Sequence, residues 1–326
     1  MSRLIFGIRR FVAFGAVVLG ASYGLLVRFV FGVGVVAQWA DVMMVTFLFV
    51  VPLVVGFLTV YAHPTPVEEW RGGTSIVMPW VSALLAVAAS LLLAWEGIIC
   101  IVVWLPLFFV LGSVGGVIAG LVRRHGERPR PLVLVSVAII PFVLAPLESR
   151  LPTPVMGRTV ENTIVIEADP ATVWAEIREV PAIAPGELGP SFAHRIGFPR
   201  PIEARLEGTG VGSVRYASFE GGVVFVERVT EWDEDRALAF TIDAGAVPPT
   251  TFDTHVAVGG PYFDVLTGRY VIEPLGEHRV RLHLASTHRL STRFNAYTRL
   301  WTDLFMRDIQ QNILEVIRAR AERGAE

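Results

Sequence analysis

The distribution of apolar residues divides the chain near residue 150. In the first half, largely apolar runs alternate with short segments that contain charged or turn residues. Most of these runs reach the roughly 20 residues that a helix needs to cross the hydrocarbon core of a bilayer. Five runs have this character: 11–31, 42–61, 76–95, 98–122 and 132–147. The pattern predicts a transmembrane helical domain of five spans over residues 1–150.

The fifth run is short and contains Pro141 and Pro146. It could span with a kink, lie in the membrane interface or re-enter, and spanning is the favoured interpretation. A cleavable signal peptide is disfavoured for the first run, because further apolar runs follow it and no small-residue cleavage pattern stands out. The first span is therefore expected to remain in the protein.

Basic residues set the expected orientation, since short cytoplasmic loops are enriched in them. They lie before the first span, between the second and third, and between the fourth and fifth: Arg3, Arg9, Arg10, Arg71, Arg123, Arg124, Arg128 and Arg130. Five spans would then place the amino terminus inside and residues 151–326 outside. We expect a multi-pass protein of the cell (inner) membrane whose soluble domain lies on the external or periplasmic side.

A few polar and small residues within the apolar runs need an explanation, because a charge in lipid is costly. Arg28 is expected to reach toward the interface from the end of its span, and Glu96 to lie in the turn at Trp95-Glu96-Gly97. Glycines recur along the fourth run and predict close approach of a neighbouring helix: Gly112, Gly115, Gly116 and Gly120.

The second half has the short alternating runs of a β-rich domain, separated by Gly and Asp turns. Seven strands are predicted, at 162–167, 202–207, 212–219, 223–232, 237–243, 265–273 and 279–288. A short helix over 171–179 follows the first strand, with Asp169 as its N-cap and Pro170 as its first residue. The segment 294–322 has a broad apolar face at helical spacing, so one long helix is expected to close the domain.

Charge supports the same division and narrows the possible partners. Residues 1–147 carry nine Arg and five acidic residues, whereas residues 148–326 carry nineteen Arg and twenty-five acidic residues, a net −6. An acidic domain without a clustered basic face gives no reason to expect nucleic-acid binding. The single Cys100 allows no disulfide, and the His spacing matches no metal-ligand motif, so neither a cofactor nor a metal is predicted.

Several local sequences in the second half resemble the START-related helix-grip superfamily, which includes polyketide cyclases and lipid-transfer domains. They are the runs 166–174, 208–212 and 227–232 and the region 301–310, in the order strand, short helices, six strands, long helix. The resemblance covers about 155–322 and does not extend to residues 1–150. It implies a seven-stranded antiparallel sheet curved around the long helix in residues 151–326, with an apolar ligand cavity between them.

Strand alternation indicates which side chains would line that cavity. Tyr270 shares a face with Ile272, Phe240 with Leu238 and Ile242, and His288 with Leu282. Polar groups that could orient a ligand are Tyr216, Glu227, His255, Tyr270 and His288. The predicted ligand-binding residues are Tyr216, Phe240, Tyr270, Leu282, His288, Tyr297 and Leu304, and none of them is assigned a catalytic role.

Three functions remain open from the sequence. The favoured one is membrane-anchored binding or transfer of a hydrophobic ligand, either a lipid or a polyketide-like molecule. The second is a cyclase- or dehydratase-type enzyme with an apolar substrate. The third is a structural or regulatory membrane protein whose soluble domain contacts another protein. No nucleophile elbow supports a hydrolase.

Overall fold

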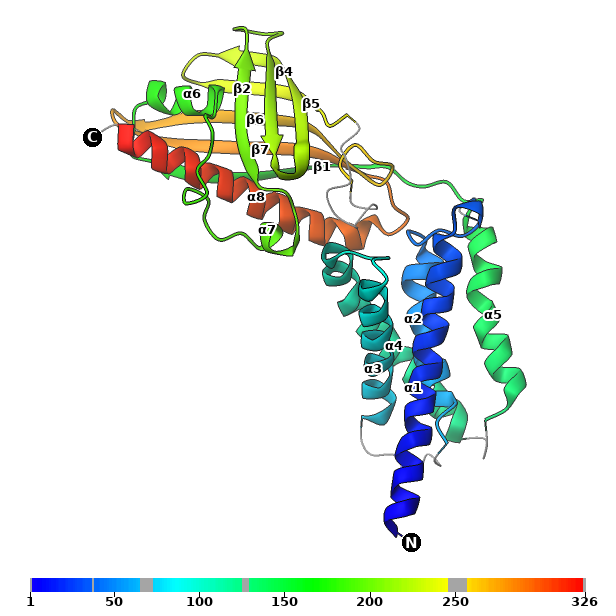
Figure 1. Ribbon diagram of the computed structural model, residues 1–326. Coiled ribbons are helices and arrows are strands. Elements are labelled where there is room, and N and C mark those ends of the chain that lie inside the picture. Colours follow the sequence, from blue (N-terminus) through cyan, green and yellow to red (C-terminus); the bar gives the residue numbers. More distant parts are fainter. Residues whose placement is uncertain (1, 37, 65–72, 125–128, 246–256, 325–326) are drawn as a thin grey trace. The chain divides into compact units, whose positions relative to one another are not determined.

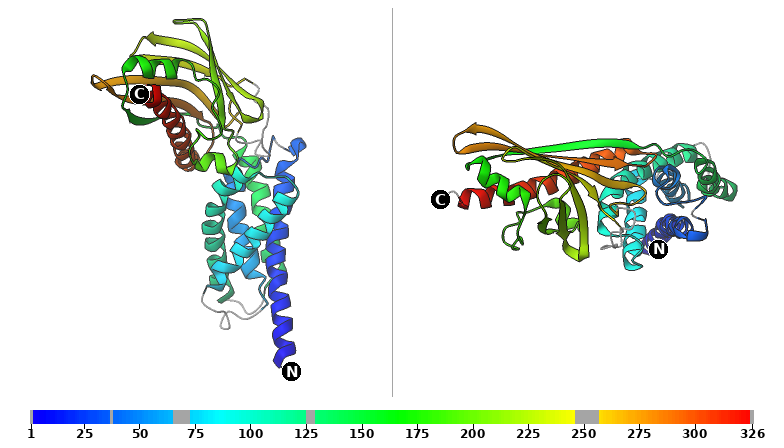
Figure 2. Two further views of the ribbon diagram at one scale, coloured as in Figure 1. Left: turned by 60° about the vertical axis from the view of Figure 1, so that its left-hand side comes forward. Right: turned by 90° about the horizontal axis from the view of Figure 1, so that it is seen from above.

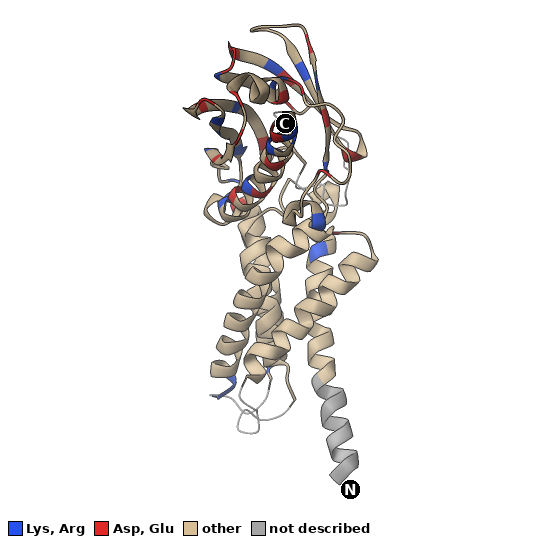
Figure 3. Ribbon diagram, turned by 90° about the vertical axis from the view of Figure 1, so that its left-hand side faces the viewer, with Lys and Arg blue, Asp and Glu red and all other residues tan. Residues whose placement is uncertain are grey.

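The computed structural model describes residues 2–36, 38–64, 73–124, 129–245 and 257–324, with side chains from residue 14 onward. The chain forms two compact units, Met1–Thr153 and Pro154–Glu326. Charged residues are frequent along the ribbon of the second unit and rare on the helices of the first (Figure 3). Of the residues that the sequence singled out, Arg71, Arg128 and His255 lie outside the described ranges.

The first unit is helical, and four of its helices are long and apolar enough to cross a membrane. These are the Phe14–Gly32 part of α1 (Ser2–Gly32), and α3 (Thr74–Leu92), α4 (Ile98–Arg124) and α5 (Pro131–Glu148). The predicted fifth span is thus a continuous helix despite Pro141 and Pro146. The second predicted span is the short one, because its helical part is η2 (Thr46–Val50) followed by α2 (Val51–Tyr61).

Polar side chains inside this unit bind one another or backbone groups. Arg28 forms an ion pair with Glu96 and donates a hydrogen bond to the Trp95 carbonyl at 2.8 Å. The Glu148 carboxylate accepts hydrogen bonds from the backbone N–H groups of Val45 and Thr46, both at 2.7 Å. These N–H groups begin a helix and have no partner within it, so Glu148 links the end of α5 to the start of η2.

Glycines let α2 and α4 pack with their backbones almost in contact. A Cβ atom added to Gly115 would lie 2.0 Å from the Leu53 carbonyl oxygen, and one added to Gly56 would lie 2.0 Å from the Gly112 carbonyl oxygen. A Cβ atom added to Gly116 would lie 2.1 Å from the carbonyl oxygen of Ser75, in the first turn of α3. The expectation that the glycines of the fourth run allow close helix approach is therefore confirmed.

The second unit is an antiparallel sheet of seven strands in the order β1-β7-β6-β5-β4-β3-β2. Its strands are β1 (Met156–Ile166), β2 (Pro201–Glu207), β3 (Val214–Phe219), β4 (Val223–Asp233), β5 (Ala237–Asp243), β6 (Phe263–Gly276) and β7 (Arg279–Leu290). The helices are α6 (Pro170–Arg178), α7 (Phe192–Ile196) and α8 (Asn295–Gly324). The sheet twists strongly, and α8 lies along one face of it (Figures 1 and 2). The predicted seven-stranded sheet with a long C-terminal helix is confirmed.

The connection between β1 and α6 follows the sequence closely. Asp169 occupies the N-cap position of α6 with an extended backbone, and Pro170 is the first helical residue. The Asp169 side chain makes no capping hydrogen bond to the helix and lies 2.7 Å from the His278 Nδ1 atom instead. The position was therefore predicted correctly, and the carboxylate has a different partner.

Candidate functional site

The inner face of the sheet, which we define as the face turned toward α8, is set by strand register. Gln310 of α8 donates to the Val160 carbonyl at 3.1 Å and to the Ser286 hydroxyl at 2.9 Å, so β1 and β7 lie beneath the helix. Successive side chains alternate between the two faces of a strand. The inner residues that follow from the register of the remaining strands include Leu282, Leu284, His288, Gly268, Tyr270, Ile272, Leu238, Phe240, Glu227 and Arg215.

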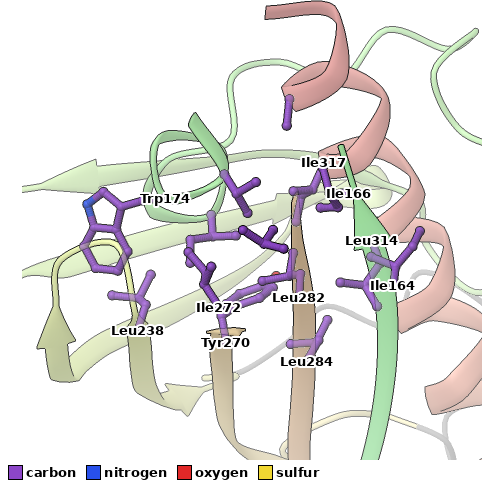
Figure 4. Close-up of a cluster of buried hydrophobic side chains, with 14 of the residues drawn as sticks. Ile164, Ile166, Trp174, Leu238, Tyr270, Ile272, Leu282, Leu284, Leu314 and Ile317 are labelled. Carbon is purple, nitrogen blue, oxygen red and sulfur yellow. The ribbon is translucent and has the colours of Figure 1, made fainter. Parts of the chain in front are cut away.

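One part of the inner face is a packed core. Figure 4 shows Trp174 of α6 beside Leu238, and Leu314 and Ile317 of α8 near the end of β1. Leu282 is fully buried in this cluster. Such a side chain mainly contributes burial of apolar area, on the order of 2 kcal/mol for a leucine. Leu282, Phe240 and Tyr270 were predicted to line a ligand site, and in this structure all three belong to this buried cluster.

A buried ion pair lies on the inner face between β3 and β4. Arg215 and Glu227 are directly opposite each other across the two strands and form an ion pair, and each is about 5% exposed. The Arg215 Cζ atom lies 5.3 Å from the centre of the Phe240 ring, within the range of a cation–π contact. The Phe240 ring lies over β6, where Gly268 has no side chain to obstruct it: a Cβ there would be 2.5 Å from the ring.

Tyr270 completes this polar group. Its hydroxyl interacts with the Arg215 guanidinium, and its side chain is 3% exposed. Burial raises the pKa of Tyr270 to about 12, with Arg215 opposing the rise. Burial also raises the pKa of Glu227, and the Arg215 guanidinium offsets part of that effect. Because an arginine stays protonated in proteins, an ionised Glu227 is the form that balances its charge at neutral pH.

His288 marks a second polar position on the inner face. It is fully buried, and no described residue forms a hydrogen bond with either ring nitrogen. Its neighbours are Arg158, opposite it on β1, and Phe263, whose ring centre is 5.6 Å away. Arg158 is itself bound by Asp303 of α8 at 2.7 Å. Burial lowers the pKa of His288 below the ordinary histidine value, so the ring is neutral at pH 7.

This histidine gives a testable pH dependence of stability. In the unfolded chain His288 takes up a proton as the pH falls through about 6.5, whereas the folded protein resists protonation because its pKa is lowered. The unfolded state therefore binds more protons, and stability falls as the pH decreases below about 6.5. We expect the midpoint temperature of unfolding of the full chain to decrease when the pH is lowered from 7.5 to 5.5. The decrease should be smaller in His288→Phe. Equal slopes in both proteins would contradict this.

The other two histidines near the sheet have different surroundings. His283 is on the outer face, with its Nδ1 atom 2.8 Å from Glu161 and its Nε2 atom 3.2 Å from Glu273. His278 is exposed and contacts only Asp169 among the ion pairs of the described chain. Within the residues that the structure describes, no group of three or more His, Cys, Asp or Glu side chains is placed to hold a metal ion.

Tyr216 was assigned to the wrong face of β3. Arg215 and Ala217 are the buried side chains of that strand, whereas Tyr216 is partly exposed and lies under the exposed Arg205, 5.9 Å from its Cζ atom. Val214 and Tyr216 are two residues apart and largely apolar, which favoured the opposite assignment of the faces. The hairpin itself carries the missing signal, because a turn at 220–222 places Arg215 opposite Glu227.

On α8 the inner side chains are only partly those expected. Leu304 is 47% exposed and Leu300 is 60% exposed, so the predicted role of Leu304 in lining the site is wrong. Phe305 is the buried neighbour. The apolar positions of this helix cover more than one face, and only one face meets the sheet. Tyr297 is half-buried, and burial raises its pKa.

The comparisons concern the second unit. No family model and no curated protein matches the chain. Solved structures match about half of it. A norcoclaurine synthase point mutant of Thalictrum flavum, in complex with a transition-state analogue, has 12% identity and a TM-score of 0.35, covering 53% of this chain and 99% of that one.

Two further matches have similar values. The Zhui aromatase/cyclase of Streptomyces sp. R1128 has 16% identity and a TM-score of 0.33, and covers 52% of this chain and 96% of its own. A START superfamily protein from Mycobacterium smegmatis has 13% identity and a TM-score of 0.35, and the match covers 51% of this chain and 97% of that one. The third carries the name of the superfamily that the sequence resembles. At these identities the likeness concerns the fold alone.

Proposed function

We propose that this protein is a membrane-anchored binding or transfer protein whose second unit holds a hydrophobic small molecule, a lipid or polyketide-like compound, on the inner face of the sheet. The observation that carries the proposal is the composition of this face. It is apolar apart from a few buried polar groups: Arg215 with Glu227 and Tyr270, His288, and Ser286 with Gln310 of α8. Sites for small apolar ligands have this composition, with few polar groups that fix orientation.

Anchoring gives such a protein a physical advantage. An apolar ligand partitions into the bilayer, and a binding domain tied to the same bilayer meets it at a raised effective concentration. Four long apolar helices and the shorter Thr46–Tyr61 helix are available as spans, and we propose that all five cross the membrane. The lipid bilayer is then a partner of the first unit.

The ligand is tested by mass spectrometry of the full chain extracted in mild detergent. We expect one class of apolar compound, in amounts comparable to the protein and enriched over its share in a lipid extract of the same membranes. Detection of bulk membrane lipids alone, in their membrane proportions, would remove the support for the proposal.

The side of the membrane follows from the basic loops. With five spans and Arg123, Arg124 and Arg130 held inside, residues 154–326 lie outside the cell membrane, in the periplasm of a diderm bacterium. Alkaline phosphatase fused after Glu326 should be active, and green fluorescent protein fused there and exported unfolded should be dark. Inactive phosphatase together with a fluorescent reporter would place this unit in the cytoplasm, and the number of spans would then be even.

A second candidate function is a cyclase- or dehydratase-type reaction of an apolar substrate. It is favoured by the position of Glu227, a buried carboxyl group with a raised pKa on the same face as Tyr270. Returning the co-purified extract to ligand-free protein would test it. A product lighter by one water, formed by the wild type and not by Glu227→Gln, would support catalysis, whereas an unchanged compound would support binding alone.

A further inference from the structure

Among the described residues, several polar groups on the inner face have buried hydrogen-bonding atoms without a partner, and besides Arg215 Nε they include atoms of His288 and Gln310. His288 is fully buried, and both of its ring nitrogens lack a partner among the described residues. Gln310 of α8 is 3% exposed, and its Oε1 atom has none either. Buried polar atoms are normally hydrogen-bonded, because leaving them unpaired costs the full price of desolvation. These atoms therefore point to a bound polar group.

The two side chains lie in the same part of the inner face. Gln310 is fixed through its Nε2 atom, which donates to the Ser286 hydroxyl at 2.9 Å and to the Val160 carbonyl at 3.1 Å. Ser286 and His288 are two residues apart on β7 and thus share a face. Gln310 Oε1 is therefore a fixed acceptor on the same face as the imidazole, which in its neutral form offers one donor and one acceptor.

The charges on this face are already balanced. Asp303 holds Arg158 through two contacts, at 2.7 Å to Nη2 and 3.1 Å to Nε. Arg215 is paired with Glu227. His288 is kept neutral by burial, which lowers its pKa. Each guanidinium therefore has a carboxylate partner, and a phosphate or carboxylate head group would meet no unbalanced positive charge on the described part of this face.

We propose that the ligand is an uncharged lipid with a hydroxyl group, and that His288 and Gln310 bind this hydroxyl. A hydroxyl is both donor and acceptor, so it can accept from the imidazole N–H and donate to Gln310 Oε1. The inference deepens the proposed function and rests on it. It identifies the ligand by its head group, since the apolar remainder of the face is compatible with many acyl, sterol-like or isoprenoid chains.

A matched pair of probes tests the head group. Oleyl alcohol and oleyl phosphate have the same chain and differ in charge at pH 7.5. With the full chain freed of ligand in detergent, we expect the alcohol to bind about tenfold more tightly or better. His288→Phe should reduce alcohol affinity by about tenfold and leave the weak phosphate binding unchanged. His283→Phe, the same substitution on the outer face of the same strand, is the control and should change neither.

A second measurement is made on the wild-type protein and uses the His288→Phe spectrum only for assignment. In wild-type protein labelled with ¹⁵N-histidine, the resonances missing from the His288→Phe spectrum belong to His288. Oleyl alcohol should shift them, and oleyl phosphate should not. Shifts confined to other histidines would overturn the inference.

The outcomes also separate this inference from the proposed function. If phosphate binds as tightly as alcohol, or if His288→Phe keeps its alcohol affinity, the head-group assignment is wrong and water fills the site, while hydrophobic ligand binding stands. If neither probe binds and no apolar compound co-purifies, the proposed function fails and the inference fails with it.

Discussion

Replacing Glu227 with alanine should destabilise the second unit by about 3–5 kcal/mol, because it leaves the buried Arg215 charge without its partner. A guanidinium cannot escape the penalty by losing its proton. In detergent, the unfolding transition of this unit should move to clearly lower temperature or lower denaturant concentration. The double variant Arg215→Met with Glu227→Leu should recover most of the loss, since apolar residues of similar size remove both charges together.

The exposed pair Arg205–Glu207 on the adjacent strand is a matched control. Its side chains are 62% and 53% exposed, and an exposed ion pair contributes at most about 1 kcal/mol. Glu207→Ala should therefore change stability little. If Glu227→Ala costs no more than Glu207→Ala, the Arg215–Glu227 pair is not buried in the folded protein and our description of the inner face is wrong.

Replacing Gly115 with alanine should disrupt the packing of α2 against α4. The added Cβ atom would lie 2.0 Å from the Leu53 carbonyl oxygen, which is backbone and cannot rotate away. Overpacking of this kind costs about 1–3 kcal/mol, and occasionally more. We expect a lower unfolding temperature of the first unit in detergent.

Gly15 supplies the control. It lies in α1, and no atom of the described residues is within 4 Å of the position its Cβ atom would take. Gly15→Ala should be neutral or slightly stabilising, because alanine is the better helix former. A Gly115→Ala protein as stable as Gly15→Ala would show that the two helices do not approach as closely as described.

The elements of the second unit could be predicted because apolar and polar residues alternate with period two along each strand. Ala237–Asp243 agrees with its predicted range at both ends, and the other strands differ by a few residues. Which residues face inward was harder to predict where a strand is irregular. In β6 the register shifts between Val265 and Thr267, so Val265 is buried and Leu266 is exposed, the reverse of the expected alternation.

The candidate site shows a second limit of pattern reading. Arginine is rarely buried, and the alternation along β3 alone does not indicate that Arg215 faces inward. The burial of Arg215 is explained by its pairing partner, since Glu227 lies directly across the hairpin. The placement of Gln310 against Ser286 likewise depends on contact between β7 and α8, which are distant in the sequence.

In the first unit, the apolar composition of the runs predicted where the helices lie, but the length of a run did not always predict the length of its helix. The apolar runs gave its helices, but the run 42–61 is helical only over Thr46–Tyr61, and Glu148 binds the N–H groups at its beginning. The pairing of Arg28 with Glu96 joins α1 to the turn before α4, a contact that neither residue alone could indicate. Charged side chains in apolar surroundings are satisfied by partners that only the folded chain brings together.

The central claim, that the inner face of the sheet holds an apolar ligand, is tested most directly by photo-crosslinking. A long-chain alcohol with a diazirine on its chain is bound to the full chain, activated by light, and located by peptide mass spectrometry. The account predicts labelling within β5, β6, β7 or α8 at inner positions such as Phe240, Tyr270 or Gln310, suppressed by excess oleyl alcohol. Labelling confined to residues 1–153 or to outer positions, and unaffected by competitor, would contradict it.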